Sequence, residues 1–167
     1  MRRNAIRLTF VLLAAAVWAG CGAGGERDAV KTYAEETLPP LIDILTAALE
    51  RYDNVSGGNF VDEATTYETV RDAILPGLKE LVLQAEAVHP ESADVTRVHD
   101  SFLAAVRRYV SAFQLFLLSL DQQSMTNTAV ALEELEEAHT LRRTFERRFE
   151  DVCGEYGIMP GAPAPSP

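Results

Sequence analysis

Two Glu-x-x-His pairs carry the residue types of a transition-metal site: Glu86 with His89, and Glu136 with His139. A carboxylate and an imidazole three residues apart lie on the same face of a helix, so each pair could supply two ligands to one metal ion. If both pairs met inside a helical bundle, together they could bind two irons. The first question is therefore whether the helices bring the two pairs together.

This pattern resembles that of the ferritin-like di-iron proteins, in which two such pairs face each other inside a bundle. The order along the chain argues against that arrangement. The Glu86 pair falls at the end of the second helical segment and the Glu136 pair near the start of the fourth. In an up-down-up-down bundle these segments run in the same direction, which separates the pairs by roughly 20–25 Å along the helix axes. We therefore predict no di-iron site.

His89 and His99 are the remaining candidates for metal ligands. Both are expected at the same end of the bundle, where two imidazoles could bind zinc or copper. The sequence defines no third ligand, so we expect no bound metal and no other cofactor. His139 follows the acidic run 133–137 and precedes Arg142 and Arg143, and it is expected on a solvated helix face with ion pairs four residues apart.

Cys153 is the second site of candidate chemistry. The sequence Cys153-Gly154-Glu155-Tyr156 lacks the C-x-x-C-H pattern and so excludes covalent haem attachment. Cys153 shares an apolar helix face with Phe149 and Tyr156, which predicts a buried structural thiol. The sequence also has no nucleophile-elbow motif and no glycine-rich phosphate loop. We therefore expect that the protein is not an enzyme.

Helices must position these residues. Apolar residues recur every three or four positions, and no stretch alternates as a half-buried strand would. Short polar loops join the segments, which predicts an all-α fold, an up-down-up-down four-helix bundle. Pro39-Pro40 marks either a kink or the start of the first main helix, and Pro76 is expected to kink the second. The expected helices cover about residues 27–53, 62–88, 93–120 and 127–156.

The third segment is more apolar than one core face requires. The sequence Leu115-Phe116-Leu117-Leu118 makes it apolar almost all round. Either this helix is fully enclosed by the bundle, or the excess marks a surface for a partner.

The composition limits the partners. The 167 residues include 25 Asp and Glu against 15 Lys and Arg, a net charge of −10. Binding to phosphate groups rests on Lys and Arg, so this balance excludes nucleic acid as a partner. It also excludes electrostatic docking to anionic lipid.

The N-terminus has the pattern of a secretory signal peptide. Arg2, Arg3 and Arg7 precede the apolar run Leu8–Ala19, and no acidic residue occurs before Glu26. Twelve residues span about 18 Å as a helix, too short for a hydrocarbon core of about 30 Å. A basic start, a short apolar run and then small residues are typical of a signal peptide.

The run ends in Trp18-Ala19-Gly20-Cys21, which resembles the lipobox of bacterial lipoproteins, Leu-(Ala/Ser)-(Gly/Ala)-Cys. Trp18 stands where that motif has an aliphatic residue. The resemblance implies cleavage between Gly20 and Cys21 and a lipid on the Cys21 thiol. Gly22, in place of Asp, implies the outer membrane in a Gram-negative cell and otherwise the outer face of the cell membrane. The alternative is ordinary cleavage nearby, for example after Ala23.

The chain then divides into four parts, whose ranges are signal peptide 1–20, lipidated Cys and short tether 21–26, helical bundle 27–156, and disordered proline-rich tail 157–167. Cleavage removes three basic residues and no acidic one, so the net charge becomes −13. The exported part loosely resembles uncharacterised helical-bundle lipoproteins, with Pro90 ending one helix and His99 opening the next. That resemblance transfers no activity.

We therefore expect a membrane-anchored lipoprotein of the bacterial cell envelope, a non-catalytic interaction or structural module. Its expected partners are the membrane, through the lipid on Cys21, and another envelope protein. The alternative is a helical lipoprotein that binds a metal or a small ligand. A short tether would place the loops 53–60 and 121–127, both polar, at the end far from the membrane, where a partner could reach them.

Overall fold

The computed structural model describes residues 22–159, and the lipobox-like residues and the tail from residue 160 lie outside this range. The described chain is helical, with no strand, which confirms the predicted all-α fold. Its elements are α1 (Gly22–Thr32), η1 (Tyr33–Thr37), α2 (Leu38–Asp53), η2 (Gly57–Asn59), α3 (Glu63–Thr69), η3 (Val70–Ile74), α4 (Leu75–Glu86), α5 (Ala93–Asp121) and α6 (Met125–Glu155).

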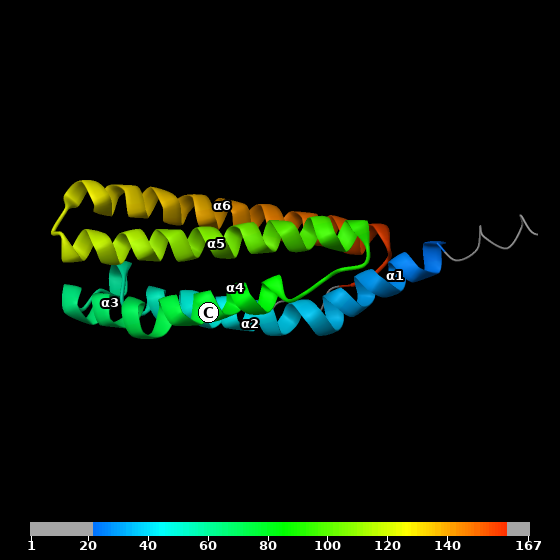
Figure 1. The fold of residues 1–167 in the computed structure, drawn as a ribbon, viewed down its shortest axis with the longest axis horizontal. Helices are drawn as coiled ribbons and strands as arrows, with labels where there is room; N and C mark the ends of the chain where they lie inside the picture. Colours follow the sequence, from blue (N-terminus) through cyan, green and yellow to red (C-terminus); the bar gives the residue numbers. More distant parts are fainter. Residues whose placement is uncertain (1–21, 160–167) are drawn as a thin grey trace, which may run out of the picture.

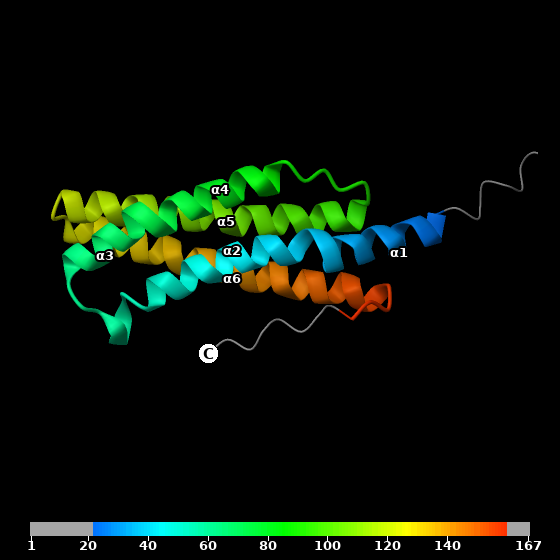
Figure 2. The ribbon, with the colours of Figure 1, turned by 90° about the horizontal axis from the view of Figure 1, so that it is seen from below.

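These elements form the four helices of the bundle. Elements α1, η1 and α2 make one continuous helix, and α3, η3 and α4 make the second. The two lie side by side in one layer, and α5 and α6 form the other layer (Figures 1 and 2). Each helix runs opposite to the one before it in the chain (Figure 1), as predicted for an up-down-up-down bundle.

The predicted interruptions at Pro39-Pro40 and Pro76 are wide turns inside continuous helices. The Leu38 N–H donates to the Tyr33 carbonyl, and the Leu75 N–H to the Val70 carbonyl, each five residues earlier. A proline has no N–H to donate, and its ring clashes with the carbonyl four residues before it. One extra residue in the preceding turn makes room for that ring. Both helices therefore continue past their prolines.

Polar side chains start the three helices that follow loops. Asp62, Ser92 and Ser124 each accept a hydrogen bond from a backbone N–H three residues further on. The first turn of a helix has N–H groups without helical partners, and these caps satisfy one each. Between α5 and α6, Gln123 has a positive φ of 50°, which lets the chain reverse within a few residues.

The core runs along the whole bundle and is richest in aromatic side chains from α5 and α6. The Phe102 and Phe145 ring centroids are 5.2 Å apart, and those of Tyr52 and Phe113 are 5.0 Å apart. Both distances are typical of favourable aromatic pairs. The aromatic stripe seen in the sequence is therefore core, with Phe102, Tyr109, Phe113 and Phe145 fully buried and Phe116 and Phe149 packed against them.

The prediction of a short flexible tether before the bundle is wrong from Gly22 onward, because α1 begins there. Val30 and Tyr33 are buried in the core, and the Arg27 Nε donates to the Tyr156 carbonyl at 3.2 Å. These contacts therefore hold the later part of α1 against the bundle. Extending an existing helix needs no new nucleus, so it can continue back through the glycines.

The start of the predicted tail is also part of the folded domain. Gly157 has a φ of +63°, the left-handed conformation that ends many helices. The Ile158 N–H donates to the Cys153 carbonyl at 2.9 Å, and the Gly157 N–H to the Gly154 carbonyl at 3.2 Å. The Ile158 side chain is buried. The bundle therefore includes Ile158 rather than ending at Tyr156.

Helix α5 alone, among the described helices, has the length and apolarity of a membrane-crossing segment. Phe102, Tyr109 and Phe113 of this helix belong to the core. Packing against α4 and α6 buries 33% of its most apolar stretch, so the core accounts for only part of its apolar character.

Candidate functional site

Gly20 and Cys21 lie outside the described residues, so cleavage and lipidation there stay predictions. The described chain begins at Gly22 with α1. Figure 1 shows the first turns of α1 running out past the adjacent ends of α5 and α6. Arg27 and Asp28 are exposed, and from Gly24 onward Val30 is the first buried residue. The eight residues before Val30 span about 12 Å as a helix, so α1 is a helical stalk in front of the bundle.

Tyr156 ties this stalk to the bundle. Its carbonyl accepts the Arg27 Nε at 3.2 Å, and its hydroxyl donates to the Asp94 Oδ2 at 2.7 Å. The hydrogen bond to this carboxylate raises the pKa of Tyr156 to about 12. The same bond, together with Arg97, lowers the pKa of Asp94. The phenol and the carboxylate therefore keep these protonation states at neutral pH, and they join α1, α5 and α6.

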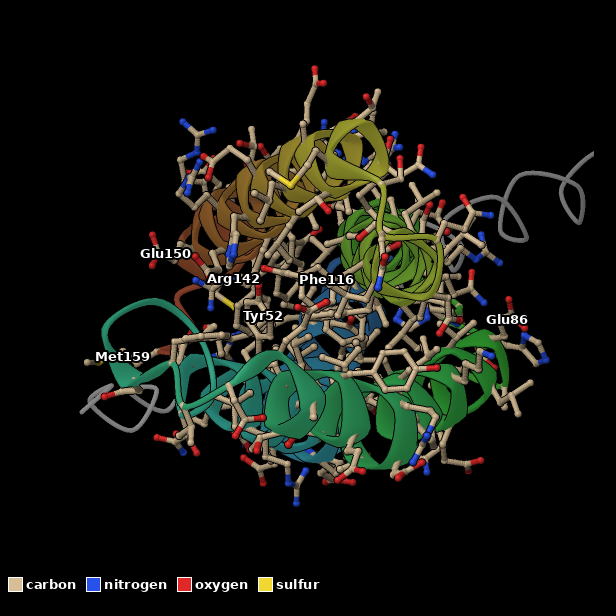
Figure 3. The ribbon with its side chains drawn as sticks, turned by 90° about the vertical axis from the view of Figure 1, so that its left-hand side faces the viewer. Tyr52, Glu86, Phe116, Arg142, Glu150 and Met159 are labelled. Atoms are coloured by element: carbon tan, nitrogen blue, oxygen red, sulfur yellow. The ribbon has the colours of Figure 1, made fainter. Side chains whose placement is uncertain are left out.

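The two Glu-x-x-His pairs do not form a shared site. Glu86 is exposed and forms an ion pair with Arg107 at 2.7 Å. Glu136 is exposed and lies 3.4 Å from Arg143. Figure 3 shows Glu86 on the opposite side of the bundle from Arg142 of α6. Neither carboxylate faces the interior, where a di-iron centre would form.

His89 and His99 are not brought together as a metal-binding pair. His89 is exposed in the loop after α4, whereas His99 is only 4% exposed in the core. The His99 Nε2 lies 2.9 Å from the Ala85 carbonyl, and its Nδ1 lies 3.1 Å from the Tyr33 hydroxyl. A carbonyl only accepts, so Nε2 carries the proton and Nδ1 accepts from Tyr33. Both ring nitrogens are therefore occupied.

No other metal-binding cluster was found among the described residues: residues 22–159 contain no group of three or more His, Cys, Asp or Glu side chains placed to hold a metal ion.

His139 is not on a fully solvated face, and that prediction was wrong. The residue is partly buried, and its Nδ1 lies 2.9 Å from the Tyr109 hydroxyl. Burial, reinforced by Arg142, lowers the pKa of His139, and burial raises the pKa of Tyr109 to about 12. At neutral pH the phenol therefore donates to a neutral imidazole. The sequence signal was the position of His139 directly after the core residue Ala138.

The predicted buried thiol of Cys153 is confirmed. Burial raises the pKa of this thiol. The thiolate is the reactive form of cysteine. Cys153 therefore fills the core as an unreactive group.

A groove between α5 and α6 was not expected from the sequence. It is an open surface groove with a volume of about 610 Å³, and that volume lies within the size range of small-molecule sites. Arg148 of α6 reaches across it to donate to the Ser101 hydroxyl of α5. Its lining combines Val98, Ala104, Leu141 and Val152 with Arg97, Asp100, Ser101, Thr144, Arg148, Asp151 and Glu155.

The bundle end opposite to α1 is less polar than expected. Of the eight exposed large apolar side chains in the described residues, six lie in its loops and helix ends. Leu118 of α5 is 44% exposed, so α5 is not fully enclosed there. The six are Phe60, Val61, Leu118, Met125, Val130 and Leu132.

Comparison with known proteins adds no relative: no family model, curated protein or solved structure matches this chain. The fold class, an all-α four-helix bundle, therefore rests on the structure itself.

Proposed function

We propose that this protein is a membrane-anchored lipoprotein of the bacterial cell envelope, whose bundle is a non-catalytic interaction or structural module. The observation that carries the proposal is the Trp18-Ala19-Gly20-Cys21 sequence at the end of a basic and then apolar leader. A cysteine at that position is the acceptor of a lipid in proteins with this motif. Two acyl chains on one residue give stable membrane attachment.

The position of α1 supports this proposal. The helix begins one residue after Cys21 and is joined to the bundle by buried Val30 and Tyr33 and by the Arg27 contact to Tyr156. An anchor at Cys21 would therefore connect to the core through a continuous helix. The end of the bundle that carries the α4–α5 loop and the end of α6 would lie nearer to the membrane (Figure 1).

The contacts of the histidines support a non-catalytic role. His99 and His139 each hydrogen-bond a buried tyrosine, Tyr33 and Tyr109. Both phenols have a raised pKa because they are buried. These groups connect helices, and they do not pair a nucleophile with a base in an open cleft.

Substitution of Cys21 tests the proposal in the full chain. Cys21→Ala should abolish incorporation of radiolabelled palmitate and leave an uncleaved, heavier precursor. Cys153→Ala is the matched control: it removes a buried thiol and should leave labelling unchanged. Palmitate that remains on the Cys21→Ala chain would refute the lipobox interpretation, as would an unlabelled wild-type chain.

The groove between α5 and α6 favours a second candidate, a lipoprotein that binds a small ligand. Its volume of about 610 Å³ and its mixture of apolar and charged walls suit a small polar molecule. Mass spectrometry and metal analysis of protein purified without a His tag test this candidate. A stoichiometric bound molecule or metal would favour it over a purely structural module.

A further inference from the structure

The end of the bundle opposite to α1 combines apolar side chains with charge of one sign. This end is formed by residues 52–66 and 116–134 (Figure 1). These two ranges contain six acidic residues and neither Lys nor Arg, and the nearest basic residue along the chain is Arg51, directly before the first range. We call this region the acidic apolar end.

The charges at the acidic apolar end are largely uncompensated. Glu134 pairs with Arg108, and Asp62 caps α3. Asp53, Glu63 and Glu133 are exposed, and none of them forms an ion pair with another described residue. Their field would attract a cation.

Helix α6 supplies the apolar surface between these charges. Met125 and Leu132 are seven residues apart, which places them on one stripe of the helix, and they are 84% and 49% exposed. Leu132 also borders a small apolar hollow with Tyr52 and Phe116. Figure 3 shows Tyr52 of α2 beside Phe116 of α5 where the two layers meet, and their ring centroids are 6.3 Å apart.

We propose that the acidic apolar end binds a cationic amphipathic helix of another envelope protein, which would be the partner of the anchored bundle proposed above. Apolar side chains of that helix would cover Met125 and Leu132, and its Lys or Arg side chains would reach Asp53 and Glu133. Recognition of an amphipathic helix by an apolar strip with complementary charges is an established mode of peptide binding.

The charge excludes two other occupants. A second copy that bound through the same end would bring one set of six acidic residues against another, with no Lys or Arg in either set, and like charges in contact oppose association. An anionic lipid surface would be repelled for the same reason. The occupant must therefore carry positive charge.

Peptide binding to the full chain in neutral phosphatidylcholine nanodiscs tests the proposal. The probe is a fluorescent leucine–lysine peptide patterned as an amphipathic helix, and empty nanodiscs measure its binding to lipid. The peptide should bind the protein, with an affinity that falls as salt is added. A leucine–glutamate peptide of the same pattern should not bind. Met125→Gln with Leu132→Asn should weaken binding of the lysine peptide at least tenfold.

Leu83→Asn is the matched control, because Leu83 is 62% exposed on α4 between Glu80 and Glu86. It should leave the affinity unchanged. The proposal would be overturned if the α6 double variant bound the peptide as well as wild type, because attraction to an acidic surface alone would then explain the binding. Equal losses for Leu83→Asn and for the double variant would also overturn it, because the affinity would then not depend on this surface in particular. Absence of binding above the empty nanodiscs would also overturn it, as would dimers that form through Leu132 without peptide. If the chain is not acylated at Cys21, the same peptides and variants are measured with the chain free in solution, so the two proposals can fail separately.

Discussion

Removal of the buried Tyr33 hydroxyl should destabilise the bundle far more than removal of a partly exposed tyrosine hydroxyl. Tyr33 and His99 are each 4% exposed, and the Tyr33 hydroxyl donates to the His99 Nδ1 at 3.1 Å. Tyr33→Phe would leave this nitrogen buried without a donor. Such a group costs about 1–3 kcal/mol. For a domain of this size, that cost lowers the Tm by about 4–12 °C.

The contribution of this hydrogen bond can be separated from that of the ring. In Tyr33→Phe with His99→Leu, both polar partners are removed together. The Ala85 carbonyl, which loses its bond from His99, still accepts the Val88 N–H at 3.1 Å. We expect the double variant to be about 1–2 kcal/mol more stable than the sum of the two single effects, because no buried group is left unpaired.

Urea denaturation of the chain from Gly22 onward, followed by circular dichroism at 222 nm, measures these free energies of unfolding. Tyr52→Phe is the matched control. Tyr52 is partly exposed, so water can replace its hydroxyl contacts, and the change should be within about 0.5 kcal/mol of wild type. The reasoning would be refuted by a Tyr33→Phe effect as small as that of Tyr52→Phe, or by strictly additive effects in the double variant.

Three further substitutions test the core, a helix cap and the charge of His139 by the same unfolding measurement. Phe102→Ala should cost about 3–5 kcal/mol, because the fully buried ring packs against Phe145; a cost below 1 kcal/mol would contradict that packing. Ser92→Ala should cost about 1 kcal/mol, since the Ser92 hydroxyl caps α5, and Ser92→Asp should recover most of it. Burial lowers the pKa of His139 from its ordinary value of 6.5, so the unfolded chain takes up this proton first as the pH falls. Stability should therefore decrease below about pH 6.5, and it should decrease less steeply in His139→Gln. Parallel stability curves for wild type and His139→Gln would show that the pKa direction is wrong.

Local patterns were sufficient to predict the helices but not their ends. The apolar spacing around Leu41, Leu45 and Leu78 requires one buried helix face, whichever helices cover it. The three glycines at 22, 24 and 25, by contrast, favour a flexible segment. Their helical state depends on Val30, Tyr33 and the contact between Arg27 and Tyr156, which is 129 residues away in the sequence.

The prolines also separate what the sequence predicts from what tertiary contacts decide. Pro39-Pro40 and Pro76 mark positions where a regular helix cannot continue unchanged. Whether the helix ends or widens depends on what holds it on both sides. Tyr33 and Leu38 are both buried across the first wide turn, so packing holds the helix on both sides and the turn gains a residue instead of ending the helix.

The histidines could be placed on helices from the sequence but could not be assigned partners. The rotation of a helix within a bundle decides which side chains at the edge of its apolar face are covered. For His99 the deciding partner is Tyr33, 66 residues away, and for His139 it is Tyr109, 30 residues away. A spacing of three residues within one helix, as in Glu136 and His139 of α6, carries no information about such contacts.

By itself the sequence set the acidic charge and predicted the leader, the lipobox-like cysteine and the all-α class, because each depends on composition or on residues close together in the chain. Only the tertiary structure decided that α1 is a stalk joined to the bundle, and that Tyr33 and Tyr109 hydrogen-bond His99 and His139. It also decided that apolar side chains gather at the acidic apolar end. These features depend on distances between separate helices. Packing sets those distances, and it is specified by the shapes and positions of side chains throughout the bundle.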